Sequence, residues 1–162
     1  MTSTSILLDV LIIGGGPSGL STALGLARQF HTAVVFDSGT HKDAPEPHMH
    51  NFVSWDHQSP AAFRAASKTN ILGRYNTIQF QDVAVETVGR TPEGLFMARD
   101  VAGRDWLGRK LVLATGVQDI FPDIDGYADC WAKGMYVSSL RTQLASPILI
   151  LGQLSLLVLS RF

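Results

Sequence analysis

The sequence predicts an α/β fold built on a parallel sheet, and three observations lead to this prediction. An unbroken apolar run, residues 10–13, leads into a glycine-rich turn at residues 14–19. A helical pattern follows the turn, and a second apolar run over residues 32–36 ends on Asp37. Strand, glycine turn, helix and strand in this order form a β-α-β unit, here residues 8–37, of the Rossmann-like type that binds dinucleotides.

Several positions of the glycine turn are expected to have separate roles. Gly14 lets the chain turn sharply out of the strand, and Gly16 lets a pyrophosphate approach the backbone because it has no Cβ. Gly19 lets the following helix lie close to the sheet. Pro17 suits a first helical turn, where its missing N–H would have no partner. The N–H groups and the positive end of the helix dipole would then face the phosphates.

The motif G-x-G-x-x-G alone is weak evidence, so the residues around it matter. An apolar stripe at helical spacing runs toward residue 30 and contains Leu20, Ala23, Leu24 and Ala27. Asp37 follows the glycine turn after about 20 residues, the spacing at which an acidic side chain hydrogen-bonds the ribose hydroxyls. These joint features favour a dinucleotide site over an ordinary glycine-rich turn.

Composition excludes several classes of protein. The chain has 162 residues, of which 46% are hydrophobic, so it is long and apolar enough for one globular domain. Its 13 basic and 14 acidic residues form no basic face for nucleic acid. Its one cysteine, Cys130, excludes an internal disulfide framework. The first residues lack a basic segment typical of secretory signals, so we expect a cytoplasmic protein.

Residues 38–58 are expected to form a loop that contains four histidines: His41, His48, His50 and His57. Three interpretations compete. His48-x-His50 could supply two metal ligands, although a zinc site needs three or four and no further motif supplies them. The histidines could instead be solvated or paired locally. In the third interpretation, one of them lines the dinucleotide, because the loop leaves the strand beside the ribose.

The second half of the chain alternates between helix and strand signals. Residues 60–72 favour a helix capped by Ser59. From residue 75 the apolar period becomes two, which predicts a strand in the parallel sheet, a three-stranded β-meander and a separate final strand. That strand ends in Thr115-Gly116, which would bring backbone close to a ligand at the carboxyl end of the sheet. A plain strand exit is the alternative.

Several motifs match a known family in order: residues 14–19, 37–39, 48–51, 55–57, 111–117 and 124–127. Together they resemble FAD-binding, thioredoxin-reductase-like flavoproteins, in particular the fungal dithiol oxidases of the gliotoxin type, which close disulfides in secondary metabolites. The resemblance covers about residues 9–136. Its most specific parts are the His-x-His-Asn loop and the Ala-Thr-Gly strand end.

The resemblance implies FAD as the cofactor and assigns roles to residues. The glycine turn would hold the pyrophosphate, Asp37 the adenosine ribose, and Val83 the adenine through its backbone. His50 would lie near the flavin. The residues implied in cofactor binding are Gly14, Gly15, Gly16, Pro17, Ser18, Gly19, Asp37, Ser38, Gly39, His50, Val83, Ala114, Thr115 and Gly116. No catalytic or metal-binding residue is expected in this chain.

The resemblance also implies an activity that this chain lacks the parts to perform. In the family, a Cys-x-x-Cys pair exchanges electrons with the flavin, and NADP or oxygen is the second acceptor. Here Val137 follows Tyr136 where that segment would continue, and Cys130 is alone. We therefore expect a truncated, partial FAD-binding domain over residues 1–136, inactive by itself. The family implies a small dithiol metabolite as substrate and often a homodimer; a membrane association is not expected.

Two other functions stay open at this point. The chain could be an inactive nucleotide-binding fragment or partner subunit, or the FAD half of a flavin monooxygenase. The β-meander and the Ala-Thr-Gly strand end are common to these FAD enzymes. The His-x-His-Asn loop and the Gly126-Tyr127 segment separate the dithiol oxidases from the monooxygenases.

Residues 137–162 are expected to be an apolar tail outside the family pattern. Their mostly aliphatic run, residues 147–160, is shorter than the roughly 20 residues of a membrane span. A C-terminal anchor, an edge element of a shortened core and an unselected sequence are the three interpretations. We favour the last, as translated intron or shifted frame, because Val137-Ser138 can be encoded by GTA-AGT, a common intron start.

Sequencing transcripts across the Tyr136 codon tests the intron interpretation. We expect a spliced message that continues into a Cys-x-x-Cys segment and a second glycine turn. Transcripts that all end at Phe162, together with a protein that sediments with membranes, would replace this interpretation with the anchor.

Overall fold

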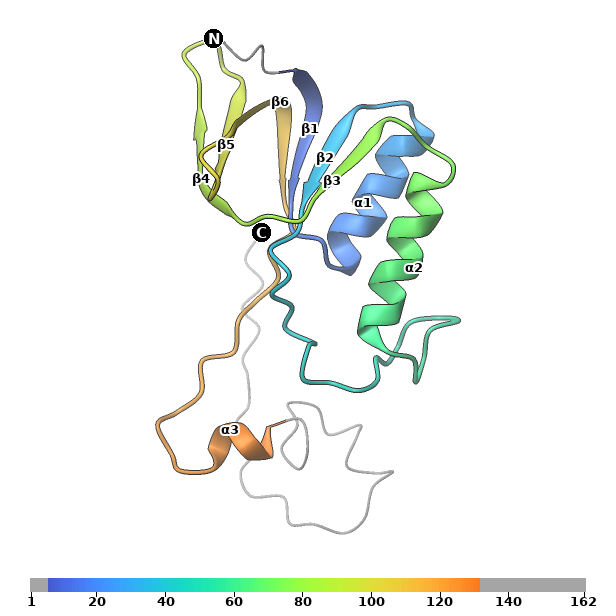
Figure 1. Cartoon of the computed structure of the whole chain (residues 1–162), viewed down its shortest axis with the longest axis vertical. Coiled ribbons are helices and arrows are strands. Elements are labelled where there is room, and N and C mark those ends of the chain that lie inside the picture. The colour runs from blue at the N-terminus through green and yellow to red at the C-terminus, as the bar shows by residue number, and fades with distance from the viewer. Residues whose placement is uncertain (1–5, 132–162) are drawn as a thin grey trace, which may run out of the picture. The chain divides into compact units, whose positions relative to one another are not determined.

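The computed structural model describes residues 6–131. Residues up to Ile120 form one compact unit, and a second unit begins at Phe121. The first unit holds a six-stranded sheet in the order β3-β2-β1-β6-β5-β4 with two helices (Figure 1). In chain order the elements are β1 (Leu7–Ile13), α1 (Pro17–Arg28), β2 (Ala33–Phe36), α2 (Pro60–Leu72), β3 (Ile78–Gln81), β4 (Val85–Arg90), β5 (Phe96–Asp100), β6 (Asp105–Leu113) and, in the second unit, α3 (Tyr127–Cys130).

The predicted β-α-β unit and α/β fold are confirmed. β1 pairs in parallel with β2 on one side and with β6 on the other, and β2 pairs in parallel with β3. β1 is therefore an inner strand, and its residues Leu11 and Ile12 are completely buried. An unbroken apolar sequence suits this place because both faces of the strand are covered.

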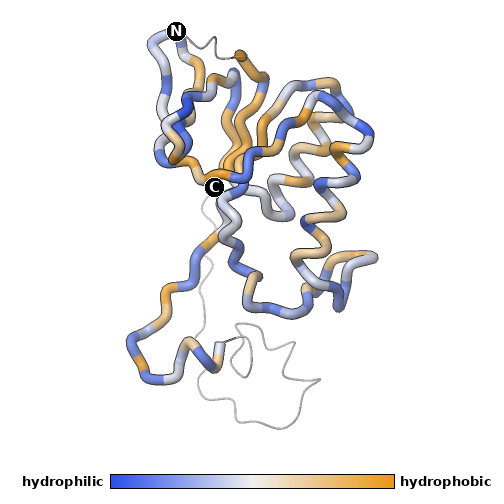
Figure 2. The backbone as a smooth tube through the Cα atoms, in the orientation of Figure 1, coloured by the Kyte–Doolittle hydropathy of each residue, from blue (hydrophilic) through white to orange (hydrophobic). Residues whose placement is uncertain are grey.

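The first unit has three layers: the helices, the parallel strands and the β-meander. The helices α1 and α2 pack on one face of the parallel strands, where Leu20 and Ala23 meet Ile12 and Val35. The β-meander β4-β5-β6 covers the other face, where the rings of Phe36 and Trp106 meet edge to face at 5.4 Å. Figure 2 shows the hydrophobic residues concentrated along the central strands between these layers.

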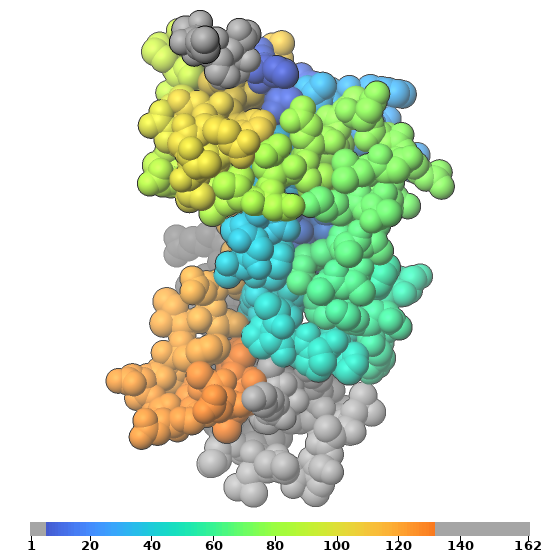
Figure 3. All heavy atoms as spheres, in the orientation of Figure 1, coloured from blue at the N-terminus to red at the C-terminus, as the bar shows by residue number. Residues whose placement is uncertain are grey.

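The sequence locates the second helix well. α2 begins at Pro60 and ends at Leu72, as predicted, and the Ser59 hydroxyl accepts a hydrogen bond from the Ala62 N–H at 3.4 Å. The preceding loop lies against α2 (Figure 3). Arg64 of α2 and Asp43 of the loop form an ion pair at 2.7 Å. No residue of loop 38–58 is in a helix or strand, also as predicted.

The prediction of a separate final strand is wrong, because the third meander strand and the final parallel strand are one. β6 pairs antiparallel with β5 up to Gly108 and parallel with β1 from Leu107 to Leu113. Gly108 is no turn residue; a Cβ there would lie 2.6 Å from the Leu11 side chain. Beyond Gly108, β6 pairs within the described residues on its β1 side alone, so its other edge is open.

Two expectations concern the end of the chain. The boundary at residue 136 and the apolar tail 137–162 lie outside the described residues and stay predictions. Within residues 6–131, no helix is both long and apolar enough to cross a bilayer.

In the second unit, the short helix α3 carries the exposed Cys130, and the rings of Phe121, Tyr127 and Trp131 form a cluster.

A buried carboxylate closes the turn between β5 and β6. Asp100 is fully buried and accepts hydrogen bonds from the Ala102 and Arg104 N–H groups, from Arg104 Nε at 2.9 Å and from Trp106 Nε1 at 3.1 Å. Burial by itself raises the pKa of Asp100, but the hydrogen bonds from Trp106 and Arg104 outweigh it, so the pKa is lowered. The ionised carboxylate is therefore the form that the fold stabilises.

Replacing Asp100 by Asn should lower the free energy of unfolding by about 2–3 kcal/mol, because charged hydrogen bonds are lost in a buried site. Because its folded-state pKa is lowered, the contribution is present above the ordinary aspartate pKa and is lost as the pH falls through the lowered value. Urea unfolding at neutral and acidic pH measures both effects. Asp105→Asn, in the exposed pair with Arg99, is the control and should change stability far less. Equal effects of both variants would contradict this account.

Candidate functional site

The candidate site lies where three neighbouring parallel strands end. The glycine turn follows β1, Asp37 follows β2, and Ala114 follows β6. Backbone hydrogen bonds join these ends: the Gly14 N–H donates to the Phe36 carbonyl at 2.9 Å, and the Ala114 N–H donates to the Ile13 carbonyl at 2.8 Å. Ligands of open α/β sheets bind at such carboxyl ends.

Two glycines of the turn are required by backbone packing. Gly14 has a φ of +119°, and a Cβ there would overlap the Ala114 carbonyl group. A Cβ at Gly19 would overlap the Gly14 carbonyl oxygen, so Gly19 lets α1 start directly against the turn. Both positions therefore need glycine whether or not a ligand is bound.

Gly16 differs, because a Cβ at this position would meet no atom within 4 Å. Gly16 is the N-cap of α1, has an extended backbone and makes no side-chain capping bond, and the first turn of α1 contains no acidic residue. The helix N-terminus thus faces open space. Its N–H groups and the positive end of its dipole suit an anion there.

Asp37 is held next to this opening by contacts on both of its oxygens. Its Oδ1 accepts a hydrogen bond from the Gly39 N–H at 2.9 Å and lies 3.3 Å from His41 Nε2. A Cβ on Gly15 would overlap the Asp37 carboxylate, whose Oδ2 lies against that glycine. The glycine turn and the acidic residue, predicted separately from the sequence, therefore lie in direct contact.

Sequence reasoning missed the roles of Gly15 and His41 at Asp37. The dinucleotide-binding motif allows any residue at position 15. The only signal in this sequence was that position 15 is also a glycine, which suggests that a side chain would not fit there. His41 lies four residues after Asp37 in a loop, and no pattern in the sequence indicated their contact. Ser38, the other predicted neighbour, uses its hydroxyl to accept a hydrogen bond from the Thr40 N–H at 3.3 Å.

Three consecutive loop residues tie residues 38–58 to three different elements. His41 contacts Asp37 after β2, Lys42 Nζ lies 3.3 Å from an oxygen of Asp119 after β6, and Asp43 pairs with Arg64 on α2. These contacts fix the course of the loop, and the Lys42 pair, the most exposed of the three, adds little to stability.

Four other predicted site residues lie in three places. Thr115 and Gly116 are exposed after β6, and Gly116 has a φ of +68° with open space where a Cβ would be. Val83 lies between β3 and β4 and packs against the core under the β-meander. His50 lies farther along the loop, with its Nδ1 3.5 Å from Asp56 Oδ1.

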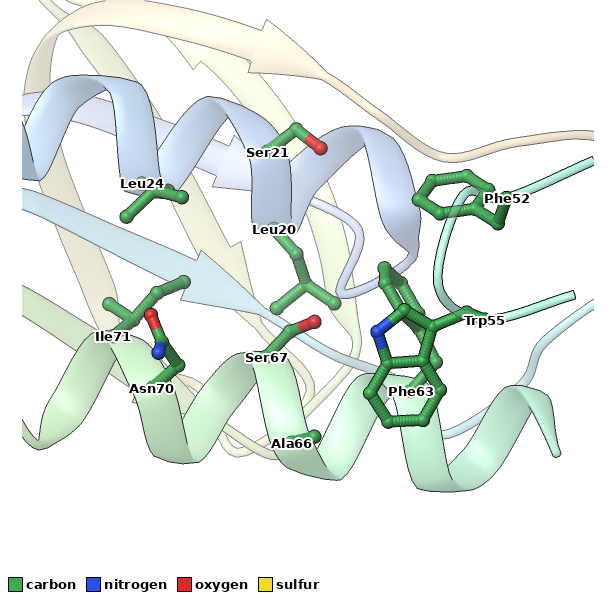
Figure 4. Close-up of a pocket in the computed structure, with 10 residues that line it drawn as sticks. All are labelled: Leu20, Ser21, Leu24, Phe52, Trp55, Phe63, Ala66, Ser67, Asn70 and Ile71. Carbon is green, nitrogen blue, oxygen red and sulfur yellow. The ribbon is translucent and has the colours of Figure 1, made fainter. Parts of the chain in front are cut away.

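A cavity of about 330 Å³ lies between α1 and α2, and none of the predicted site residues lines it (Figure 4). Phe52 and Trp55 from the loop pack their rings edge to face on Phe63 of α2, with centroids 4.9 and 5.5 Å apart. These aromatic contacts fasten the loop to the helices. The cavity is lined mainly by the two helices together with these two loop rings, and it is distinct from the opening at Gly16.

The fold and the site geometry agree with one family. Residues 8–148 match the pyridine nucleotide-disulphide oxidoreductase family. The chain belongs to this family. The match ends at residue 148, whereas we expected resemblance to end near residue 136, so the position of that boundary stays a prediction.

Relatives and solved structures resemble this family member over about four fifths of its length. Thioredoxin reductase aclD of Aspergillus oryzae is 50% identical over 131 residues, which are 80% of this chain and 41% of the relative. Thioredoxin reductase sirT of Leptosphaeria maculans is 44% identical over 137 residues, 84% of this chain and 42% of the relative. An oxidoreductase structure from Agrobacterium tumefaciens is 32% identical with a TM-score of 0.74, covering 79% of this chain and 43% of that one. The chain thus spans about two fifths of the length of these proteins.

Valine substitutions should separate the two kinds of glycine in the turn. Gly16→Val should lower the free energy of unfolding by about 1 kcal/mol, because valine is a poorer N-cap than glycine, although the position is open and its extended backbone suits valine. Gly19→Val should prevent a cooperative fold, because its side chain would overlap the Gly14 backbone. Thermal melts followed by circular dichroism compare the two. Similar melts for both variants would contradict the assignment.

Proposed function

We propose that this chain is the FAD-binding N-terminal part of a thioredoxin-reductase-like disulfide oxidoreductase. The observation that carries the proposal is the open position at Gly16, in front of the α1 N-terminus, with the fixed Asp37 carboxylate beside it. Membership of the pyridine nucleotide-disulphide oxidoreductase family supports a dinucleotide cofactor of the flavin type.

The residues present fit the two polar parts of such a cofactor. The N–H groups at the start of α1 would take the pyrophosphate, which needs the space that a side chain at Gly16 would fill. Asp37 would accept hydrogen bonds from the ribose hydroxyls, and its contacts with Gly39 and His41 hold it in place for this. The loops after β2 and β6 would flank the cofactor. A bound flavin supplies the electron transfer that no side chain of this chain provides.

The proposed reaction is the exchange between dithiols and disulfides of a small metabolite. The names of the relatives, thioredoxin reductases from fungi, support a thiol or disulfide substrate. Thiol–disulfide exchange within one chain needs two cysteines, and this sequence has Cys130 alone. We therefore propose that the redox-active pair and the site for the second acceptor, NADP or oxygen, belong to the part that relatives have beyond this chain.

FAD binding tests the proposal directly. The chain should bind FAD in preference to NAD, and weakly, because it spans only about two fifths of its relatives' length. Isothermal titration with FAD and with NAD, supported by quenching of flavin fluorescence, measures this preference. Asp37→Ala should weaken FAD binding roughly tenfold or more, since a charged hydrogen-bond partner of the ribose is lost.

Gly16→Val tests whether binding needs the open space in front of α1. This variant should fold like the wild type but should not bind FAD. Preference for NAD, or FAD binding that survives Gly16→Val unchanged, would overturn the proposal.

A further inference from the structure

The loop before α2 brings together three side chains that the sequence did not group. His50, Asp56 and His57 each offer one nitrogen or oxygen, and these three atoms lie within 4.8 Å of one another. The imidazole rings of His50 and His57 meet edge to face, with centroids 4.7 Å apart. The sequence suggested the pair His48-x-His50, yet His48 is outside this group.

The carboxylate of Asp56 lies between the two rings at a distinctive spacing. Its Oδ1 is 3.5 Å from His50 Nδ1, and its Oδ2 is 3.4 Å from His57 Nε2. Both separations exceed the usual 2.7–3.2 Å of N–H···O hydrogen bonds. Ligand atoms at about 2.0–2.1 Å from a tetrahedral zinc ion are separated by about 3.3 Å. The two separations, each to a different oxygen of Asp56, are close to this value, and one ligand atom from each of the three residues lies within 4.8 Å of the others.

The loop holds this group in a fixed conformation. Met49 and the residues after Asp56 close the loop, because the Met49 N–H donates to the Gln58 carbonyl at 2.8 Å and the His57 N–H donates to the Met49 carbonyl at 2.9 Å. The Asn51 N–H donates to Asp56 Oδ1 at 3.0 Å and orients the carboxylate. Outer hydrogen bonds of this kind orient metal ligands and strengthen binding.

From this arrangement we propose that His50, Asp56 and His57 form a binding site for a divalent transition-metal ion of the zinc type. Two imidazoles and one carboxylate are ligands that zinc prefers. Three protein ligands leave a position for water or an exchangeable ligand, as in open zinc sites. The proposal reverses the expectation that no residue of the chain binds metal, and it does not depend on FAD binding.

Titration with zinc sulfate tests the site on the full chain, stripped of metal beforehand. Wild-type protein should bind one zinc ion per chain at the site. Asp56→Asn and His57→Ala should each lower the affinity at least about tenfold, the loss that even an outer-sphere change can cause. His48→Ala removes an exposed histidine of the same loop outside the group and should leave the affinity unchanged.

The variants' folds are compared by circular dichroism without metal, and cobalt absorption provides a second measurement. A tetrahedral cobalt spectrum should form with wild type and His48→Ala and be lost in Asp56→Asn and His57→Ala. If one of the two variants fails to fold, the other decides. No zinc binding by folded wild type, or equal losses from His48→Ala and His57→Ala, would overturn the proposal.

Discussion

The structure depends on a close backbone contact between the glycine turn after β1 and the residues that follow β6. A single methyl group on Gly14 would overlap Ala114, and one on Gly19 would overlap Gly14. Because no side chain separates them, β1 and β6 can end side by side while α1 starts directly over the turn. Gly16 lies between these two closely packed glycines, and a Cβ there would meet no atom within 4 Å.

The loop between β2 and α2 has no regular structure, and it is fixed by its side chains. Near its start, polar side-chain contacts connect it to the ends of β2 and β6 and to α2. Near its end, Phe52 and Trp55 pack on Phe63. The first part of the loop bears on the proposed dinucleotide site through His41, and the last part carries the proposed metal site. His50, predicted from the family resemblance to lie near the flavin, is also one of the three proposed metal ligands.

Much of the fold could be predicted because local sequence decides it. The apolar run of β1, the glycine turn, the Ser59 cap and the limits of α2 all depend on neighbouring residues. The continuity of β6 could not be predicted, because a glycine at position 108 suggests a turn. The reason for this glycine is the side chain of Leu11, which is far away in sequence and lies against it.

The placement of the candidate site residues was predictable in part, and their role in cofactor binding stays a prediction. The spacing of the motif placed Gly16 and Asp37 at adjacent strand ends. In contrast, the contacts of Asp37 with His41 and of Asp56 with two histidines arise from the course of an irregular loop. No periodicity in sequence encodes that course, and the sequence instead drew attention to His48.

Because β6 belongs to both the β-meander and the parallel strands, its pairing with β1 affects the order in which the strands can pair during folding. β1 pairs with β2 after one short helix, but Leu7 pairs with Leu107, so closing that loop costs far more chain entropy. The β-α-β unit can therefore form early from local contacts, while the inner position of β1 is completed late. During synthesis, the apolar edge and face of β1 stay uncovered until the residues of β6 have left the ribosome. The same strand that joins the β-meander to the sheet thus determines when the chain first becomes a folded unit.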